Sequence, residues 1–346
     1  MGIGATILMI LVFPLNSFLL MQGVFSGEKR VQADVSGNEQ SIQGLVKGVE
    51  AAKIQEPIKP KPKAQAMDNP QYQPIRKDGI KDLVVPGAHA SVIIDADTGT
   101  ILHYNEGRKE RQIASLTKLM TAVLVMENIR NLDEEVTIDE EPVYAEGTKI
   151  GCPRSGFCNS QRLKIGEKIS ARNLLQAMLM NSANDAAIAL GKHISGSEES
   201  FVNMMNTKAR DLGLTDTHFC TASGLEPNGR ETECYSSAYD IARIAAYSLR
   251  YDTIWKIALL PSNSIITSID GKVQHTILNT DQLLDQMPNM IGSKTGFTPL
   301  AGYSLLMAIS DPSTRHRIVA VVLDDVTRWQ DIKTMTSWAF NSYNWE

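Results

Sequence analysis

The 346-residue sequence predicts an α+β fold in which helices cover one antiparallel sheet and a mostly helical lobe is inserted. Apolar and polar residues alternate with a period of two near residues 90–104 and again after residue 272, which indicates strands at both ends of the globular part. Between these ends, apolar residues recur mostly at helical spacing. Strands that flank a helical middle fit one sheet with an inserted lobe, and we expect the functional site between the lobe and the sheet edge.

Residues 1–26 are predicted to form a membrane anchor or a signal segment. The run from Ile3 to Phe25 carries no charge, and a helix of this length just spans a bilayer. The missing basic start and the lack of a clear Ala-x-Ala site argue against a cleaved signal peptide, whereas Lys29 and Arg30 after the run argue against a simple outward-facing anchor. Both alternatives stay open, and either predicts an extracytoplasmic location, membrane-anchored or secreted.

Residues 27–86 are predicted to be a disordered linker and residues 87–346 a globular domain. The linker lacks hydrophobic periodicity, and its prolines are interleaved with Lys, Gln and Asp. The chain carries a net charge of −5, which argues against a nucleic-acid-binding protein.

The globular domain is predicted to begin with two strands and a helix. The strands are Ala90–Asp95 and Thr100–Tyr104, joined by a turn at residues 96–99. The helix is indicated by an apolar stripe at near-helical spacing, which we expect to be buried. The stripe consists of Ile113, Leu116, Met120 and Val123.

The middle of the domain is predicted to be mostly helical. Ala171–Met180 and Asp185–Lys192 read as two helices, so the residues between them, Asn181–Asn184, are expected to form a short turn. Ser237 is placed to cap a further helix that ends near Leu249.

The last part of the domain returns to a period of two and predicts four strands followed by an amphipathic helix. The strands are Val273–Leu278, Met290–Gly296, Tyr303–Ser310 and His316–Leu323, and the helix is Trp329–Tyr343. Asp311–Thr314 is expected to be the hairpin turn between the last two strands.

The four cysteines fit an oxidising, extracytoplasmic compartment. Cys152 and Cys158 are six residues apart and Cys220 and Cys234 fourteen, so local pairing is favoured among the three possible connectivities. A four-cysteine zinc site usually shows Cys-x-x-Cys pairs, which are absent here. Free buried thiols remain an alternative.

Ser115 and Lys118 are the candidate nucleophile and general base. In a helix, Lys118 lies one turn beyond Ser115 on the same face, so the amine and the hydroxyl are within reach of each other. The first turn of a helix also presents free backbone N–H groups that favour developing negative charge. Such a tetrapeptide alone is weak evidence, because both residue types are common on helix surfaces.

Two further motifs follow in order and strengthen the evidence that Ser115 and Lys118 are catalytic. Ser182-Ala183-Asn184 begins 67 residues after Ser115, and Lys294-Thr295-Gly296 begins 112 residues after Ser182. This trio occurs in β-lactamases and penicillin-binding proteins. With the flanking segments, the sequence resembles the D-alanyl-D-alanine carboxypeptidases, the low-molecular-mass penicillin-binding proteins. The segments that carry the resemblance are Ala114–Thr121, Asn181–Ala187, Ser223–Leu225, Gly292–Thr298 and Ala301–Ser304.

The resemblance implies a β-lactamase and DD-peptidase-like fold and a serine peptidase acting on the peptidoglycan of the cell wall. Ser115 would attack the penultimate carbonyl of a stem peptide ending in D-Ala-D-Ala, with Lys118 as base, and Ser182 would pass a proton to the leaving amine. A free lysine has a pKa of about 10.4, so burial and the second cation, Lys294, would have to lower it to about 7. β-Lactams would be covalent inhibitors, and no cofactor or metal is implied.

The remaining predicted roles concern substrate binding. Asn184 would hold a substrate amide, while Lys294 and Thr295 would hold the terminal carboxylate. Gly296 would let the substrate backbone approach the strand closely. By resemblance, backbone N–H groups of Ser115 and Phe297 would form the oxyanion hole. Many members of the family continue into a C-terminal β-rich domain and a membrane-binding helix; because this sequence shows neither, we expect membrane attachment through its N-terminal segment.

Two rivals remain from the sequence. A class A β-lactamase shares the three motifs and adds a glutamate that activates the deacylating water, and Glu226-Pro227-Asn228 superficially resembles that loop. The neighbouring Ser223-Gly224-Leu225 fits the carboxypeptidases better. A catalytically silent wall-binding or regulatory protein with the same fold is the second rival, although every expected catalytic position is filled.

Overall fold

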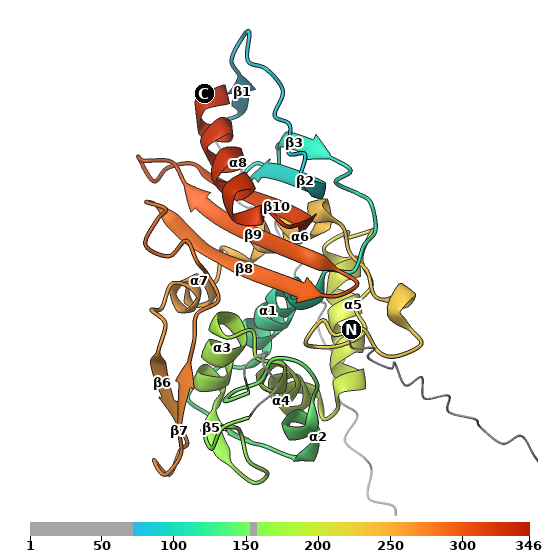
Figure 1. The fold of residues 1–346 in the computed structure, drawn as a ribbon, viewed down its shortest axis with the longest axis vertical. Coiled ribbons are helices and arrows are strands. Elements are labelled where there is room, and N and C mark those ends of the chain that lie inside the picture. The colour runs from blue at the N-terminus through green and yellow to red at the C-terminus, as the bar shows by residue number, and fades with distance from the viewer. Residues whose placement is uncertain (1–71, 153–157) are drawn as a thin grey trace, which may run out of the picture. The chain divides into compact units, whose positions relative to one another are not determined.

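The computed structural model describes residues 72–152 and 158–346, which belong to one compact unit, Lys61–Glu346. The predicted membrane segment and the linker up to residue 71 lie outside the described residues. Within the described part, a five-stranded antiparallel sheet has the strand order β3-β2-β10-β9-β8 (Figure 1). The predicted α+β fold is confirmed. The strands are β2 Ala88–Asp95, β3 Ile101–Asn105, β8 Met290–Thr298, β9 Gly302–Ser310 and β10 Arg317–Asp325.

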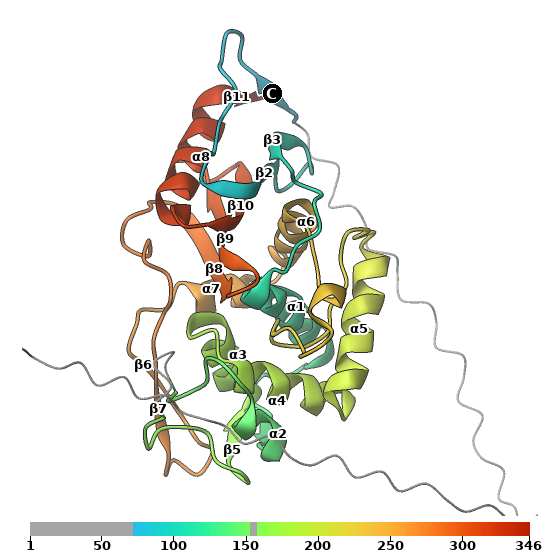
Figure 2. The same ribbon diagram turned by 45° about the vertical axis from the view of Figure 1, so that its right-hand side comes forward.

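The central strand β10 is buried on both faces, because alternate side chains enter two separate cores. Val319 and Val321 belong to the core shared with α6 (Ala238–Ser248). Ile318 and Ala320 belong to the core under α8 (Arg328–Ser342). Figure 2 shows α8 and α6 on opposite sides of the sheet. A strand with two buried faces reads as a continuous apolar run, which explains why this part of the sequence is easily recognised.

The helices on either side of the sheet lie where the sequence predicts them. α8 spans Arg328–Ser342 and covers one face. On the other face, Ser237 caps α6 by accepting a hydrogen bond from the backbone N–H of Asp240, as predicted. The helical lobe lies on this side and consists of α1 Lys118–Asn128, α2 Glu140–Tyr144, α3 Ala171–Met180, α4 Asn184–Ser195, α5 Glu198–Asp211 and α7 Asp252–Ala258. Two 3-10 turns, η1 Ala114–Thr117 and η2 Glu231–Glu233, flank it.

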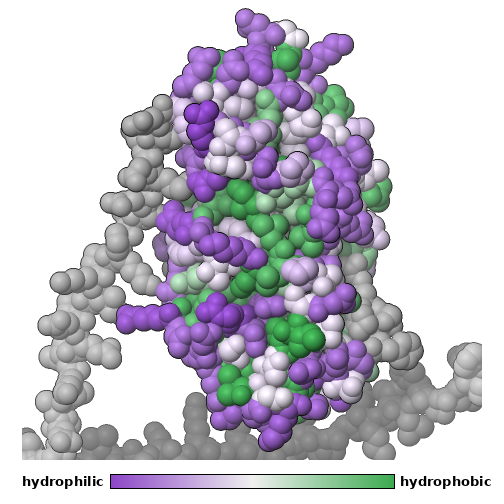
Figure 3. Space-filling model, turned by 90° about the vertical axis from the view of Figure 1, so that its left-hand side faces the viewer, coloured by the Kyte–Doolittle hydropathy of each residue, from purple (hydrophilic) through white to green (hydrophobic). Residues whose placement is uncertain are grey.

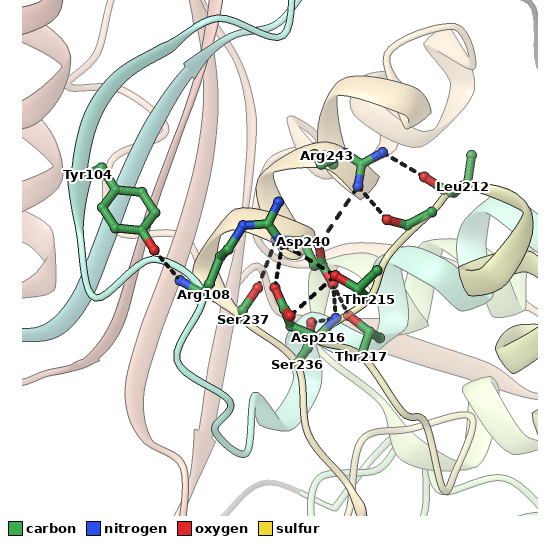
Figure 4. Close-up of polar contacts among 11 residues, drawn as sticks. Tyr104, Arg108, Leu212, Thr215, Asp216, Thr217, Ser236, Ser237, Asp240 and Arg243 are labelled. Atoms are coloured by element: carbon green, nitrogen blue, oxygen red, sulfur yellow. Dashed lines mark hydrogen bonds and ion pairs between the residues drawn. The ribbon is translucent and has the colours of Figure 1, made fainter.

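A polar network fastens the loop after β3 to the helical lobe (Figure 4). The guanidinium of Arg108 donates to the carboxylate of Asp216 at 2.9 Å, and the backbone N–H of Asp216 donates to Asp240 at 2.9 Å. Asp240 lies in the first turn of α6, and Arg243 of the same helix donates to the carbonyl oxygen of Leu212 at 2.6 Å. The network therefore joins the loop after β3 to α6 and to the end of α5.

The strand predicted at Val273–Leu278 exists but does not join the main sheet. β7 (Gln274–Ile277) pairs only with β6 (Ser264–Thr267) in a two-stranded ribbon on the lobe. Such a ribbon buries one face, and Ile265 is 61% exposed on the other. Figure 3 shows apolar areas among the polar surface on this side of the molecule. The prediction of a single sheet is wrong at this strand. The alternation of its apolar and polar residues indicates a half-buried strand but does not indicate which strand it pairs with. β4 (Glu135–Thr137) and β5 (Lys168–Ser170) form a similar pair.

The linker prediction is wrong for residues 72–86. β1 (Pro74–Arg76) pairs with β11 (Tyr343–Trp345), so the chain is tied to the domain before Gly87. The backbone N–H of Gln73 also donates to the carbonyl oxygen of Glu346 at 2.7 Å. β1 is three residues long and buries one side chain, which leaves no hydrophobic periodicity to recognise.

Candidate active site

Ser115 and Lys118 lie at the junction of η1 and α1. The Nζ atom of Lys118 donates to Oγ of Ser115 at 2.8 Å, so the predicted proximity is observed. Ser115 occupies a 3-10 turn, not the first turn of the α-helix as predicted, because α1 begins at Lys118. Ala114 has a φ of 48°, a left-handed conformation that non-glycine residues rarely adopt. The backbone thus bends sharply just before Ser115 and leaves its hydroxyl partly exposed.

Lys118 is completely buried, and its amine has three oxygen acceptors. Besides Ser115, Nζ donates to Oδ1 of Asn184 at 2.7 Å and to the carbonyl oxygen of Ser223 at 2.6 Å. Burial and, second, the charge of Lys294 hold the pKa of Lys118 well below its ordinary value, and Asp185 opposes this shift. Both predicted causes of a lowered pKa are therefore present. A neutral amine has two hydrogens, which can go to Asn184 and Ser223, and its lone pair can then accept the proton of the Ser115 hydroxyl.

Ser182 and Lys294 form a second hydroxyl and amine pair. Lys294 lies on β8 and is 3% exposed, and its Nζ donates to Oγ of Ser182 at 2.9 Å and to the carbonyl oxygen of Thr295 at 3.0 Å. Ser182 lies in the turn between α3 and α4 with a φ of 58°, again a left-handed conformation. The positive charge of Lys294 lowers the pKa of Lys118, which indicates that the two pairs lie close together.

Two glycines allow neighbouring segments of the chain to pack closely against η1. A Cβ atom on Gly224, whose φ is 82°, would lie 2.0 Å from the carbonyl oxygen of Ala114. A Cβ atom on Gly296 would lie 2.9 Å from the carbonyl oxygen of Ile113. The space that a side chain would take at Gly296 is thus filled by η1 and its preceding residue. The predicted approach of a substrate backbone to Gly296 stays a prediction. Both glycines hold Ser115 against β8 and the Ser223 loop.

Asn184 is the first residue of α4 and contacts both Lys118 and a loop of the lobe. Its Nδ2 donates to the carbonyl oxygen of Glu146 at 2.8 Å, so both side-chain polar atoms already have protein partners. The adjacent carboxylate of Asp185 accepts hydrogen bonds from the backbone of Ala186 and Ile150. Complete burial raises the pKa of Asp185 to about 7, although these hydrogen bonds oppose the shift. Asn184 is thus placed to orient Lys118, a role that the sequence analysis missed.

The other predicted substrate-binding residues, Lys294–Phe297, lie along β8. The hydroxyl of Thr295 is hydrogen-bonded to that of Thr280 at 2.9 Å. The ring of Phe297 stacks at a tilt on Tyr303 with 4.5 Å between centroids. The carbonyl of Ser223 and the hydroxyl of Thr280 are additional site groups that the sequence analysis missed. The motif around Gly224 was the available signal for the first, and Thr280 carries no recognisable signal.

Both predicted disulfides are present. Cys152 pairs with Cys158 and Cys220 with Cys234, and the described residues include no free cysteine. The zinc and free-thiol alternatives are therefore wrong. The second disulfide closes the loop that supplies the Ser223 carbonyl. Among residues 72–152 and 158–346, no group of three or more His, Cys, Asp or Glu side chains is placed to hold a metal.

Comparisons with known proteins identify relatives of this chain. The profile of the family described as D-alanyl-D-alanine carboxypeptidase matches residues 84–327. The chain is 34% identical over 264 residues to D-alanyl-D-alanine carboxypeptidase DacF of Bacillus subtilis, covering 74% of this chain and 63% of that protein. The chain spans about three fifths of the length of the first curated relatives that it matches.

Solved structures show the same fold. A D-alanyl-D-alanine carboxypeptidase from Mycobacterium tuberculosis superposes with a TM-score of 0.67 at 28% identity, covering 77% of this chain and 96% of that one. Penicillin-binding protein D2 from Listeria monocytogenes, solved in its ampicillin-bound form, superposes with a TM-score of 0.63 at 27% identity, covering 75% and 100%. The predicted DD-peptidase-like fold is thereby confirmed.

Proposed function

The chain belongs to the D-alanyl-D-alanine carboxypeptidase family, and on this basis we propose that it removes the terminal D-alanine from peptidoglycan stem peptides ending in D-Ala-D-Ala. The observation that supports this most is the buried amine of Lys118, which lies 2.8 Å from a partly exposed hydroxyl and is accompanied by a second cation.

In the acylation step, neutral Lys118 takes the proton of Ser115 as Oγ attacks the carbonyl carbon of the penultimate D-alanine. Backbone N–H groups of Ser115 and Phe297 stabilise the oxyanion. Ser182, which contacts Lys294, donates a proton to the departing amine of the terminal D-alanine. Ser182 is then reprotonated through the adjoining amines, and an acyl-enzyme on Ser115 remains.

The terminal carboxylate is held by Lys294 and Thr295. A carboxylate opposite Lys294 preserves charge balance in a site where the ammonium is 3% exposed. We propose that Asn184 acts mainly by positioning Lys118 and Glu146, and that any contact with a substrate amide is secondary. Water then hydrolyses the acyl-enzyme, with Lys118 again as base.

The same groups would cleave a cross-linked peptide, because both bonds follow a D-alanine. A free terminal carboxylate fits the Lys294 and Thr295 pair, so we favour carboxypeptidase over endopeptidase action. Release of free D-alanine from a pentapeptide, compared with cleavage of a cross-linked dimer by the same preparation, separates the two activities.

The experiment that tests the proposed function is mass spectrometry of the protein after reaction with benzylpenicillin, followed by peptide mapping. We expect one stable penicilloyl adduct on Ser115 and none on the Ser115→Ala variant. Rapid turnover without a stable adduct would favour a class A β-lactamase instead. Unreacted protein that binds but does not cleave a pentapeptide would favour a silent wall-binding protein.

We further propose that the chain acts outside the cytoplasm, held at the membrane by its N-terminal segment or released from it. The two disulfides support an oxidising compartment. No helix in the described part of the chain has the length and apolarity needed to cross a bilayer. Membrane fractionation of the full chain, with N-terminal sequencing of the product, distinguishes an anchor from a cleaved signal.

A further inference from the structure

Three alternate residues of β8 face the same side of the sheet, and each contacts a different part of the site. Lys294 contacts Ser182, Gly296 lies against η1, and the hydroxyl of Thr298 donates to Oε1 of Glu226 at 2.7 Å. Side chains two residues apart on a strand share a face and are separated by about 7 Å, so Lys294 and Thr298 lie about 13 Å apart. Lys294 makes one end of this row cationic, and Glu226, which is bound to Thr298, makes the other end anionic.

The proposed reaction fixes the direction of a bound peptide along this row. The terminal carboxylate lies at Lys294, and the carbonyl that is attacked lies at Ser115, whose turn is packed against Gly296. A peptide that passes these two points in this order continues toward Thr298 and runs antiparallel to β8. The residue that precedes D-Ala-D-Ala is then level with Thr298.

The carboxylate of Glu226 is held through one of its oxygens, and the other oxygen can still accept a hydrogen bond from a ligand. Thr298 accepts a hydrogen bond from the backbone N–H of Ala301, so its own hydrogen is directed to Oε1 of Glu226. Glu226 is partly buried, and no Lys, Arg or His of residues 72–152 and 158–346 forms an ion pair with it, while its Oε2 has no hydrogen bond there. A half-buried carboxylate without a counter-charge favours an incoming cation.

The loop that carries Glu226 is also held in place. Gly224 packs against the carbonyl of Ala114, and the disulfide between Cys220 and Cys234 closes the loop around Glu226. The backbone of this loop is therefore fixed relative to Ser115, and the carboxylate lies at a defined place beyond the nucleophile.

We propose that Glu226 forms a subsite for an ammonium group on the residue that precedes D-Ala-D-Ala, so that the protein prefers peptides with a diamino acid at that position. This inference rests on the proposed function. Glu226 is then a specificity-determining residue. The charges along the row, Lys294 at one end and Glu226 at the other, complement a peptide with a terminal carboxylate and an ammonium group on the residue before D-Ala-D-Ala.

The test compares three peptides, Nα-acetyl-Lys-D-Ala-D-Ala with its ε-amine free, acetylated or succinylated. For the unsubstituted protein at low salt, we expect kcat/KM for D-alanine release to fall in that order, with about a threefold to fivefold preference for the free amine over the acetylated one. Added salt should reduce the preference. Equal kcat/KM values for the three peptides would overturn the subsite, whereas no cleavage of any peptide and no penicillin adduct would overturn the proposed function instead.

Glu226→Gln and Glu231→Gln are the matched variants. Glu231 lies in the same loop, where its carboxylate accepts a hydrogen bond from the backbone N–H of Gly229. We expect the ratio of kcat/KM between the free and acetylated peptides to fall to about one in Glu226→Gln and to persist in Glu231→Gln. Accumulation of an acyl-enzyme in Glu226→Gln, with the peptide preference intact, would make Glu226 a deacylation base and contradict the subsite. If Glu226→Gln does not fold, the peptide series on the unsubstituted protein still decides.

Discussion

The two hydroxyl and amine pairs of the site are built in different ways. Ser115 and Lys118 are three residues apart, so a single turn brings them within 2.8 Å. Ser182 and Lys294 are 112 residues apart and meet at 2.9 Å because the turn between α3 and α4 docks against the edge strand β8. In the proposed reaction the local pair supplies the nucleophile and the base. The long-range pair depends on assembly of lobe and sheet, and the charge of its lysine lowers the pKa of Lys118.

Replacing Lys118 should have the largest effect if the local pair carries the chemistry. Methionine has a similar length and no charge, so Lys118→Met fills the buried space but removes the base. We expect the rate of acylation by benzylpenicillin to fall roughly 10³-fold to 10⁴-fold. Stopped-flow kinetics measures this, with circular dichroism as the control for folding. A loss below about tenfold would assign the base elsewhere.

Removing the hydroxyl of the long-range pair should cost less. For Ser182→Ala we expect D-alanine release to fall about 10²-fold, because water can partly replace a proton donor at this position. Ser182→Gly removes the same hydroxyl and also suits the φ of 58°. The two variants should therefore share the kinetic defect, while Ser182→Gly should melt at a higher temperature than Ser182→Ala. A loss as large as that of Lys118→Met would remove the distinction between the pairs.

Lys294 tests whether the pairs communicate. Its charge lowers the pKa of Lys118, so Lys294→Met should let that pKa rise. Protonation of Lys118 inactivates the base as the pH falls, so the acidic limb of the acylation profile should move to higher pH. The midpoint of the limb is the readout and the amplitude is not, since in the proposed function Lys294 also binds the carboxylate. An unshifted midpoint would mean that the amines are independent.

Asp185 gives the smallest effect, on stability. Burial raises its pKa from 3.8 to about 7, so the native state holds its proton more tightly than the unfolded chain. The contribution of this group is therefore lost as the pH rises from about 4 to about 7. We expect the free energy of unfolding of Asp185→Asn to fall less between pH 5 and pH 8 than that of the unsubstituted protein. Urea denaturation at both pH values checks this, and parallel pH dependences would contradict it.

Much of the fold follows from the sequence wherever burial imposes a period. β9 and β10 agree with the predicted strands within two residues, and α3 agrees exactly in its bounds, because their apolar residues repeat regularly. The pairing of β1 with β11 could not be predicted, since β1 buries a single residue. The sequence analysis did not distinguish α5 from the neighbouring helices, although Ser197 caps it by accepting a hydrogen bond from the backbone N–H of Ser200.

The site was predicted in its residues more fully than in its geometry. The motifs bring Ser115, Lys118, Ser182 and Lys294 together as expected. Contacts made by backbone atoms carry no side-chain signal, so the Ser223 carbonyl on Lys118 was missed. The contact between Gly296 and η1 was missed for the same reason, because these two segments approach each other only in the folded protein.

The central claim is that a neutral Lys118 activates Ser115. The most direct test is the pH dependence of the acylation rate constant of Ser115 by benzylpenicillin, measured for the unsubstituted protein and for Lys118→Met. We predict that the acidic limb of the unsubstituted protein reports the titration of Lys118 and disappears in the variant, whose residual rate no longer depends on pH in that range. An acidic limb that survives in Lys118→Met would show that another group is the base and would contradict the account.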